Sequence, residues 1–180
     1  GSGTSTNMNA NEVIANRSTE LLGRKRGSKL VHPNDHVNMG QSSNDVIPTA
    51  IHLAGLTAIK AELVPALEDL GKALEMKAKE FWPVIKTGRT HLQDATPIRM
   101  GQEFSGYSGQ VKRSIRRLGH AVEELSEVAL GGSAVGTGVN THPRFSGLVC
   151  ERLSRAICLN VQETENHFQS QSTMDAVIEA

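Results

Sequence analysis

Apolar residues recur every three or four positions through most of residues 46–81. Six of them carry the repeat: Leu56, Ile59, Leu63, Leu67, Leu70 and Leu74. This spacing averages the helical period and predicts one amphipathic helix of about 35 residues, roughly 50 Å long. This helix is far longer than the average of about 11–12 residues. We therefore expect other helices to pack against it along its length. Pro65 falls inside the repeat and removes one backbone donor, so we expect a kink there and not a stop.

A second long repeat covers residues 99–129. Its apolar positions alternate four and three apart and predict the seam of a helical bundle: Val111, Ile115, Leu118, Val122, Leu125 and Ala129. The opposite face is charged, and we interpret it as a solvated face and not as a binding patch. Its charged residues are Lys112, Arg113, Arg116, Arg117, Glu123, Glu124 and Glu127.

Shorter elements fit around these two helices. We expect a polar loop over residues 1–7 and a helix over residues 8–22, which Gly23 ends as a C-terminal cap. A β-branched stretch at residues 83–90 predicts a short extended segment. Residues 131–143 have the composition of a loop, residues 144–157 predict a short helix, and a new helical pattern begins at residues 172–180. The predicted fold class is therefore mostly α, a long-helix bundle with short extended segments between its helices.

Composition narrows the possible functions. Hydrophobic residues make up 38% of the chain, and the 17 glycines bring the apolar share close to the ~45–50% of globular proteins. Nineteen basic residues balance nineteen acidic ones, so the chain lacks the broad positive field of a binder of nucleic acid or anionic membranes. Only six aromatic residues occur, too few to favour a base-stacking platform. We expect no nucleic-acid partner.

Membrane insertion and disulfide bonding are not expected either. We see no apolar run approaching the ~20 residues of a membrane span, and the first residues lack the basic and apolar regions of a signal peptide. Cys150 and Cys158 lie eight apart in a stretch with a helical pattern. That spacing does not easily meet the geometry of a disulfide, so two free thiols in a reducing compartment are expected.

Two clusters of short polar side chains precede predicted helices. The first is GSGTSTN at residues 1–7, followed by Asn9 and Asn11. Hydroxyls, amides and glycine N–H groups at a helix N-terminus suit a carboxylate or phosphate, although a helix cap explains half of the cluster. The second is Gln41, Ser42, Ser43, Asn44 and Asp45. One of the last four is needed as an N-cap, and donors for an anionic ligand are an equally good interpretation of the rest.

Two histidine-containing clusters are less specific. In His32-Pro33-Asn34-Asp35-His36 the spacing matches no common zinc site, so a turn is favoured over a metal site. In the segment TGRTHLQDATP, residues 87–97, His91 lies among hydroxyls, an amide and charged groups. It is suited to moving a proton, but by residue type alone a structural histidine is favoured. The glycine-rich run at residues 131–138 lacks the ending of a phosphate loop, so nucleotide binding is not expected.

The order of these segments carries more information than any one of them. The succession GSGTSTNMNANEVIANR, HPNDHVN, QSSNDVIPTA, GRTHLQDATP, GQEFSGY and GGSAVGTGVNTHP resembles the class II fumarases of the fumarase/aspartase superfamily over essentially the whole chain. The related aspartases differ at His91, at Ser43 and after the GVNT segment, where this chain has His142-Pro143. All three positions fall on the fumarase side.

The resemblance implies a mostly helical protomer, four of which form a homotetramer with a twenty-helix core and active sites shared between protomers. It also implies reversible hydration of fumarate to L-malate, a reaction of the tricarboxylic acid cycle, with no metal and no organic cofactor. Residues 1–38 would then be the C-terminal part of an N-terminal domain, and residues 39–180 the first part of the central bundle domain. The implied location is the cytoplasm, or the mitochondrial matrix in a eukaryote.

Matched position by position, the resemblance also implies roles for individual residues. His91 corresponds to the catalytic acid/base histidine. The substrate-binding residues would be Ser2, Gly3, Thr4, Ser42, Ser43, Asn44 and Thr90, whose donors hold the two carboxylates. A second, non-catalytic dicarboxylate site would comprise His32, Pro33, Asn34 and Asp35.

One expected motif is missing from these 180 residues. The family loop Gly-Ser-Ser-x-Met-Pro-x-Lys-x-Asn supplies a catalytic serine and the groups that stabilise the carbanion-like transition state, and it does not occur here. We therefore expect an N-terminal-to-central fragment with negligible hydratase activity by itself. Two alternatives are an aspartate ammonia-lyase or another lyase of the superfamily, and a non-catalytic helical assembly module.

Overall fold

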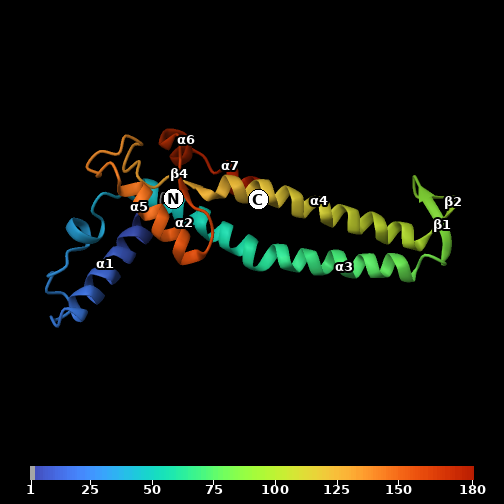
Figure 1. The fold of residues 1–180 in the computed structure, drawn as a ribbon, viewed down its shortest axis with the longest axis horizontal. Helices are drawn as coiled ribbons and strands as arrows, with labels where there is room; N and C mark the ends of the chain where they lie inside the picture. The colour runs from blue at the N-terminus through green and yellow to red at the C-terminus, as the bar shows by residue number, and fades with distance from the viewer. Residues whose placement is uncertain (1–2) are drawn as a thin grey trace. The chain divides into compact units, whose positions relative to one another are not determined.

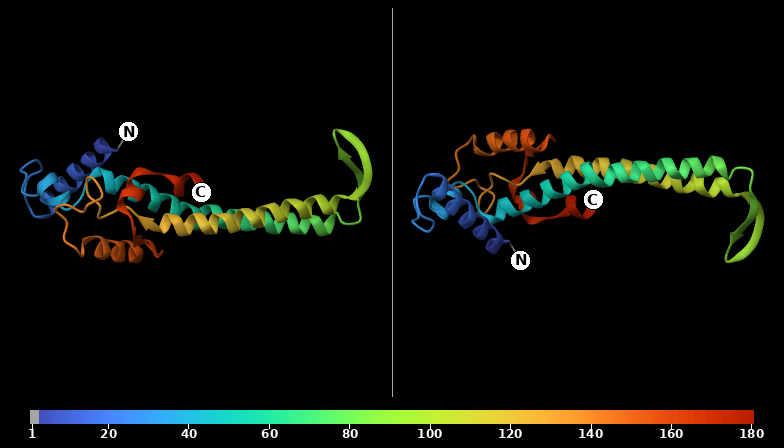
Figure 2. Two further views of the ribbon diagram at one scale, coloured as in Figure 1. Left: turned by 90° about the horizontal axis from the view of Figure 1, so that it is seen from above. Right: turned by 90° about the horizontal axis from the view of Figure 1, so that it is seen from below.

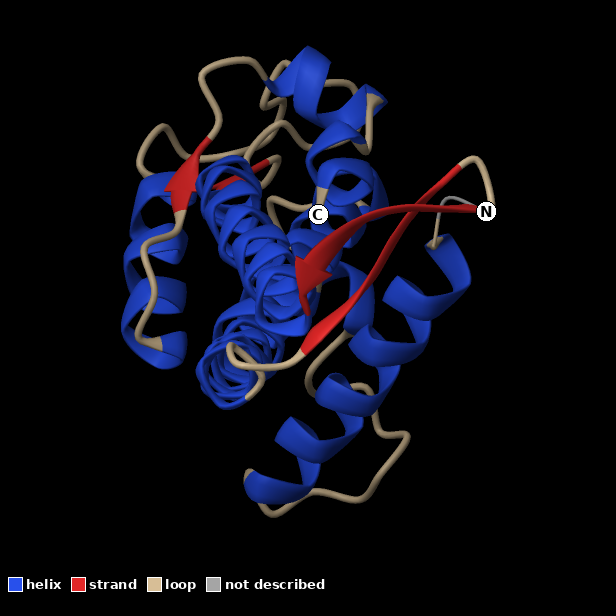
Figure 3. Ribbon diagram, turned by 90° about the vertical axis from the view of Figure 1, so that its right-hand side faces the viewer, coloured by secondary structure: helices blue, strands red, loops and turns tan. Residues whose placement is uncertain are grey.

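The computed structural model describes residues 3–180. Helices account for most of these residues, and the strands form two short pairs (Figure 3). The chain divides into two compact units: residues up to Thr57 together with Glu123–Ala180, and Ala58–Val122. The predicted mostly α fold is confirmed. The predicted domain boundary between residues 38 and 39 is a separate matter and stays a prediction.

The first unit contains most of the short elements. They are α1 (Thr4–Leu21), the π-helical turn η1 (Pro33–Val37), α2 (Ser43–Ala58), β3 (Glu127–Val128), α5 (Phe145–Ile157), β4 (Gln162–Glu163), α6 (His167–Ser172) and α7 (Asp175–Glu179). Strands β3 and β4 pair in parallel. Leu56 of α2 and Leu125, near the end of the second predicted seam, are both fully buried, so these apolar positions form the core as the repeat predicts.

Helix α1 begins earlier than predicted. We expected a loop over residues 1–7, but helical structure begins at Thr4, so the loop prediction is wrong for residues 4–7. The reason is Gly3, whose left-handed backbone (φ 74°) turns the chain into the helix and whose carbonyl accepts the N–H of Asn7 at 2.9 Å. The other end agrees with prediction, because Gly23 is also left-handed (φ 74°) just after the last turn.

The second unit is built on two long helices joined by a hairpin (Figure 1). Its elements are the π-helical turn η2 (Ile59–Leu63), α3 (Val64–Glu80), β1 (Ile85–Thr90), β2 (Gln93–Arg99) and α4 (Met100–Ser126), whose last turn passes into the first unit. Helices α3 and α4 run side by side in opposite directions (Figure 2). The hydroxyl of Ser108 on α4 donates to the carbonyl of Gly71 on α3 at 3.5 Å. The ring of Phe81 meets that of Phe104 at 5.2 Å between centroids.

Pro65 does not stop the first long helix, as predicted. The helix continues from Ser43 to Glu80, and the π-helical turn η2 ends at Leu63, two residues before Pro65. Such a wider turn is a common response where the regular hydrogen-bond ladder is interrupted. By length and composition this helix is apolar enough to cross a membrane, a test that core helices of soluble proteins also pass. Our expectation that no apolar stretch approaches the length of a membrane span is therefore wrong for Ser43–Glu80.

The hairpin differs from prediction in its second strand. Only one extended segment was expected before the second long helix, but Gln93–Arg99 pairs antiparallel with Ile85–Thr90. The two strands are joined by His91 and Leu92, both with positive φ (49° and 60°). Two-residue turns of this kind usually contain Asn-Gly or Asp-Gly, and His91-Leu92 carries no such signal of a hairpin. Both cysteines are free, as expected, with Cys150 buried and Cys158 exposed.

Candidate active site

The N-terminus of α2 is capped by two of its four polar residues. The Ser42 hydroxyl accepts the backbone N–H of Asn44 at 3.3 Å, and the Asp45 carboxylate accepts the backbone N–H of Ser42 at 2.9 Å. This arrangement resembles a capping box, with the Ser42 hydroxyl on the N–H of Asn44 and the Asp45 carboxylate reaching back to Ser42. It uses Ser42 and Asp45 and leaves the hydroxyl of Ser43 and the amide of Asn44 for other contacts. The sequence therefore holds more polar groups here than the cap requires.

Ser43 faces the start of α1. Its hydroxyl oxygen lies 3.2 Å from that of Thr4. The approach is close, since a Cβ added to Gly3 would lie 2.6 Å from Cγ1 of Ile47 on α2. The first turns of two helices thus meet here. Because free N–H groups and a partial positive charge gather at helix N-termini, this junction favours an anion.

A cavity of about 460 Å³ opens beside this junction. It is lined by Thr4, Asn7, Met8, Asn34, Asn38, Met39, Gly40, Gln41, Ser42, Ser43, Ser133, Ala134, Val139 and Asn140. We call it the polar cavity. None of these residues carries a formal charge, so a small anion would be held by hydroxyl and amide donors and by the helix ends. Asn34, which was predicted in a second site, lines the same cavity as Thr4, Ser42 and Ser43.

Three asparagines fix one wall of the polar cavity. Oδ1 of Asn38 accepts hydrogen bonds from the amides of Asn7 at 3.2 Å and Asn11 at 3.0 Å. Asn7 and Asn11 are buried on one face of α1. Sequence analysis included Asn7 and Asn11 in the first polar cluster, and their four-residue spacing places the two amides on one helix face, but it did not single out Asn38 as a site residue. It also missed Asn140, for which no local pattern exists.

The predicted second site is a capped π-helical turn. Pro33 is the buried first residue of the turn, and His32 is its N-cap. Nδ1 of His32 lies 3.2 Å from the backbone N of Asp35 and 3.1 Å from its carboxylate. The same ring nitrogen makes both contacts, so the imidazole of His32 closes the start of the turn. Within residues 3–180 no cluster of three His, Cys, Asp or Glu suits a metal ion.

Thr90 and His91 lie in the second unit, at the end of β1 and in the hairpin turn. Both are exposed, and next to them Leu92 is 98% exposed. Among the described residues the imidazole of His91 has no hydrogen-bond partner. The strands behind the turn are linked by an ion pair of 3.1 Å between Arg89 and Asp94. The hairpin turn thus leaves the side chain of His91 exposed to solvent.

The structure therefore brings together Gly3, Thr4, Ser42 and Ser43 in the first unit. Asn44 adjoins them, and its side-chain amide donates to the backbone carbonyl of Ala134 at 2.6 Å. Thr90 and His91 belong to a different unit. Ser2 lies outside the described residues.

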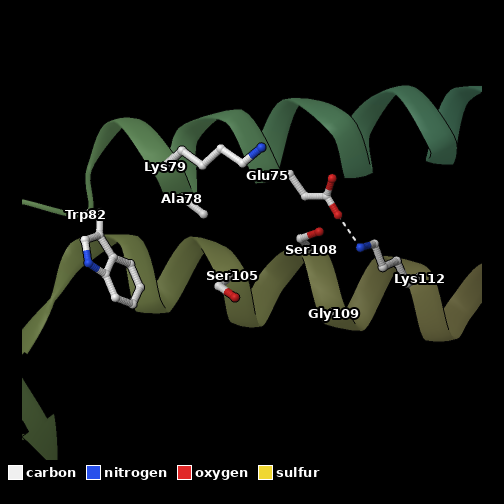
Figure 4. A pocket seen from close by; sticks show the side chains of 8 residues that line it. All are labelled: Glu75, Ala78, Lys79, Trp82, Ser105, Ser108, Gly109 and Lys112. Carbon is white, nitrogen blue, oxygen red and sulfur yellow. Dashed lines mark ion pairs between the residues drawn. The ribbon is translucent and has the colours of Figure 1, made fainter.

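A larger groove, of about 830 Å³, lies between α3 and α4 (Figure 4). It contains none of the predicted site residues. Figure 4 shows Glu75 paired with Lys112 across the two helices. The hydrogen bond and charge of Lys112 lower the pKa of the Glu75 carboxyl below its ordinary value of 4.5. Trp82 closes one end of the groove, with the Arg99 guanidinium 5.6 Å from its ring centroid. Glu75 and Lys112 neutralise each other here and lie partly in solvent, so the polar cavity is the better candidate site.

Comparison with known proteins gives a consistent result. Residues 1–180 match the family model described as lyase. The chain is 57% identical over 177 residues to the class II fumarate hydratase of Halobacterium salinarum, covering 98% of this chain and 38% of that protein. It is 53% identical over 179 residues to the mitochondrial fumarate hydratase of Saccharomyces cerevisiae, covering 99% and 37%.

A solved structure agrees with these relatives. The crystal structure of a recombinant class II fumarase from Schistosoma mansoni superposes with a TM-score of 0.95 at 39% identity, covering 99% of this chain and 40% of that one. The chain thus spans less than half the length of the relatives it matches.

Proposed function

Since the chain belongs to the lyase family, we propose that it is part of a fumarate hydratase, which adds water reversibly to fumarate and forms L-malate. The observation that carries this proposal is the polar cavity. It places uncharged donors at the junction of two helix N-termini, where Thr4 and Ser43 meet at 3.2 Å. A small dicarboxylate needs such donors and needs no global positive charge, which this chain lacks.

The substrate-binding residues are proposed to act as a set. Thr4, Ser42, Ser43, Asn44 and Thr90 donate to the two carboxylates and fix the double bond in one orientation. Ser2 and Gly3 are proposed to belong to the same substrate site. His32, Pro33, Asn34 and Asp35 form a second dicarboxylate site, in which the capped turn supplies the donors.

His91 is proposed as the acid/base group. In hydration it takes a proton from water while the oxygen adds to one alkene carbon, and another group delivers a proton to the neighbouring carbon. In the reverse direction it protonates the departing hydroxyl. Negative charge builds up on the substrate carboxylate in between, and donors aimed at that carboxylate stabilise it. The proposed reaction uses no metal or organic cofactor.

The proposed assembly is a homotetramer that shares its active sites between protomers. Support comes from the first long seam, where Leu56 and Ile59 are buried but Leu63 and Leu70 are 41% and 48% exposed. An apolar helix face left open in one protomer is suited to packing against another helix. The proposed location is the cytoplasm, or the mitochondrial matrix in a eukaryote.

Two other functions remain as competing proposals. An aspartate ammonia-lyase does not need a histidine at position 91, and the similarity to fumarate hydratases favours hydration. A non-catalytic assembly module needs only the open helix faces, whereas the polar cavity argues for a ligand. The carbanion-stabilising loop expected of the family is not among these 180 residues, so the proposed activity is that of the full-length protein.

The proposal is tested on the full-length protein with fumarate as the substrate. Hydration removes the ultraviolet absorbance of fumarate, and malate is measured separately. His91→Asn is expected to lower kcat far more than it changes KM, because a proton-transfer group acts mainly in the transition state. His120→Asn, exposed on α4, is the matched control. Release of ammonia from aspartate without malate formation would overturn the assignment, and equal losses in kcat and substrate affinity would assign His91 to binding.

A further inference from the structure

Asp45 is a buried carboxylate without a cation beside it. Its side chain is 0% exposed, and it forms no ion pair within residues 3–180. Its two oxygens instead accept three backbone N–H groups. Oδ1 accepts from Ser42 at 2.9 Å, and Oδ2 accepts from Gly131 at 3.1 Å and Ser133 at 3.0 Å. Burying a charged group is unfavourable unless hydrogen bonds replace its water, and three charge-assisted bonds do so here.

Capping of α2 alone does not require this arrangement. The bond from Ser42 completes the capping box, and an Asp in a capping box can face solvent. The bonds to Oδ2 come from residues 86 and 88 positions further along the chain. We call residues 131–138 the glycine loop. An apolar side chain would fill the same space without desolvating a charge. The presence of a carboxylate is therefore explained by its hydrogen bonds to the backbone of the glycine loop.

The glycine loop forms part of the wall of the polar cavity. Ser133 and Ala134 line the cavity together with Ser42 and Ser43. The carbonyl of Ala134 accepts the side-chain amide of Asn44 at 2.6 Å, and the carbonyl of Ser133 accepts that of Gln171 at 2.7 Å. The orientation of the Asn44 amide therefore depends on the position of the loop, and that position depends on Asp45.

We infer that Asp45 is a positioning residue of the dicarboxylate site. One oxygen holds the first residue of the α2 cap, and the other holds the glycine loop opposite it. Ser43 and Asn44 lie between these two fixed points and are set at the spacing that the substrate carboxylates require. Asp45 itself does not touch the substrate. This inference rests on the proposed function.

The test is Asp45→Asn in the assembled full-length enzyme. The substitution keeps the size of the side chain but puts an NH2 group where an acceptor is needed. KM for fumarate and for malate is expected to rise by about tenfold or more, with a smaller fall in kcat, because carboxylate contacts act in both the ground state and the transition state. A purely structural role would reduce the amount of folded enzyme and leave its KM unchanged, and that result overturns the inference.

A second variant decides the matter if Asp45→Asn does not fold. Gln171→Leu removes another side-chain anchor of the glycine loop, the bond to the carbonyl of Ser133, and leaves the α2 cap intact. Its KM is expected to rise in the same direction, and an unchanged KM would then reject the inference. Asp69→Asn, which alters an exposed ion pair with Lys72 on α3, is the matched control with unchanged KM. Wild-type enzyme that converts neither fumarate nor malate would refute the proposed function, whereas active wild type with unaltered KM in the variants refutes only the role of Asp45.

Discussion

The hydroxyl oxygens of Thr4 and Ser43 lie 3.2 Å apart and join the first turns of α1 and α2. The two residues are 39 positions apart in the chain, so the contact depends on the fold and not on local sequence. It places two helix N-termini at one point, where their partial positive charges add. The predicted substrate-binding groups of the first unit gather around this point.

Ser43→Ala tests the importance of this contact. The variant removes a hydroxyl that is proposed to donate to a substrate carboxylate. Because a hydrogen bond to a charged group contributes about 1.5–3 kcal/mol, KM should rise by roughly ten- to a hundredfold. Steady-state kinetics of the full-length enzyme measure the effect, with Ser28→Ala in an exposed loop as the control. The same KM in both variants would remove Ser43 from the proposed site.

Gly101→Ala is expected to destabilise the second unit. A Cβ at Gly101 would lie 2.4 Å from the backbone oxygen of Ala78 and 2.9 Å from the backbone of Trp82, and backbone atoms cannot swing aside. Overpacking of this kind costs about 1–3 kcal/mol. Thermal or urea unfolding measures the loss.

Gly106→Ala on the same helix is the matched control. A Cβ there meets nothing within 4 Å, so higher helix propensity should stabilise the chain by roughly 0.5–1 kcal/mol. Equal effects of the two substitutions would show that the close contact at Gly101 does not limit stability.

The two cysteines should differ in reactivity. Cys158 is exposed, whereas Cys150 is buried, and burial raises the pKa of the Cys150 thiol above its ordinary value of 9.0. Because the thiolate is the reactive form, iodoacetamide should label Cys158 at least about tenfold faster near pH 8. Peptide mass spectrometry measures both sites, and denaturant should abolish the difference. Rapid labelling of Cys150 in the folded protein would contradict its burial.

The same shift has a consequence for stability at high pH. Since the folded-state pKa of Cys150 is raised, its contribution to stability is complete below the ordinary thiol pKa of 9.0. The contribution is lost as the pH rises through the higher folded-state pKa, because only the unfolded thiol ionises freely. Cys150→Ala should therefore weaken the alkaline loss of stability that wild type shows in unfolding experiments above pH 9.

Glu75→Gln tests the ion pair across α3 and α4. The neighbouring Lys112 lowers the pKa of Glu75, so the contribution of the pair is present above the ordinary carboxyl pKa of 4.5 and is lost as the pH falls through the lower folded-state value. The pair is exposed, so we expect a small decrease in melting temperature at pH 7, smaller still in high salt, and no difference in strong acid. A difference that persists in acid would exclude the ion pair as its cause.

The sequence predicted the long helices because their apolar spacing is regular over many turns. It also predicted that the α2 start carries more polar groups than a cap uses, since Ser42 and Asp45 were enough for capping. It did not predict β2, because His91 and Leu92 adopt positive φ without a glycine or asparagine. Nor did it predict the link from Asp45 to Gly131, because a contact between residues 86 positions apart leaves no local pattern.

His91 and Leu92 both sit in backbone conformations that ordinary side chains avoid, by about 1–2 kcal/mol each. Turn statistics favour Asn-Gly in place of His91-Leu92, a substitution that would relieve this backbone strain. That choice would relax the hairpin and delete the proposed proton-transfer group in one step. Under the proposed role of His91, stability and catalysis favour different residues at this turn.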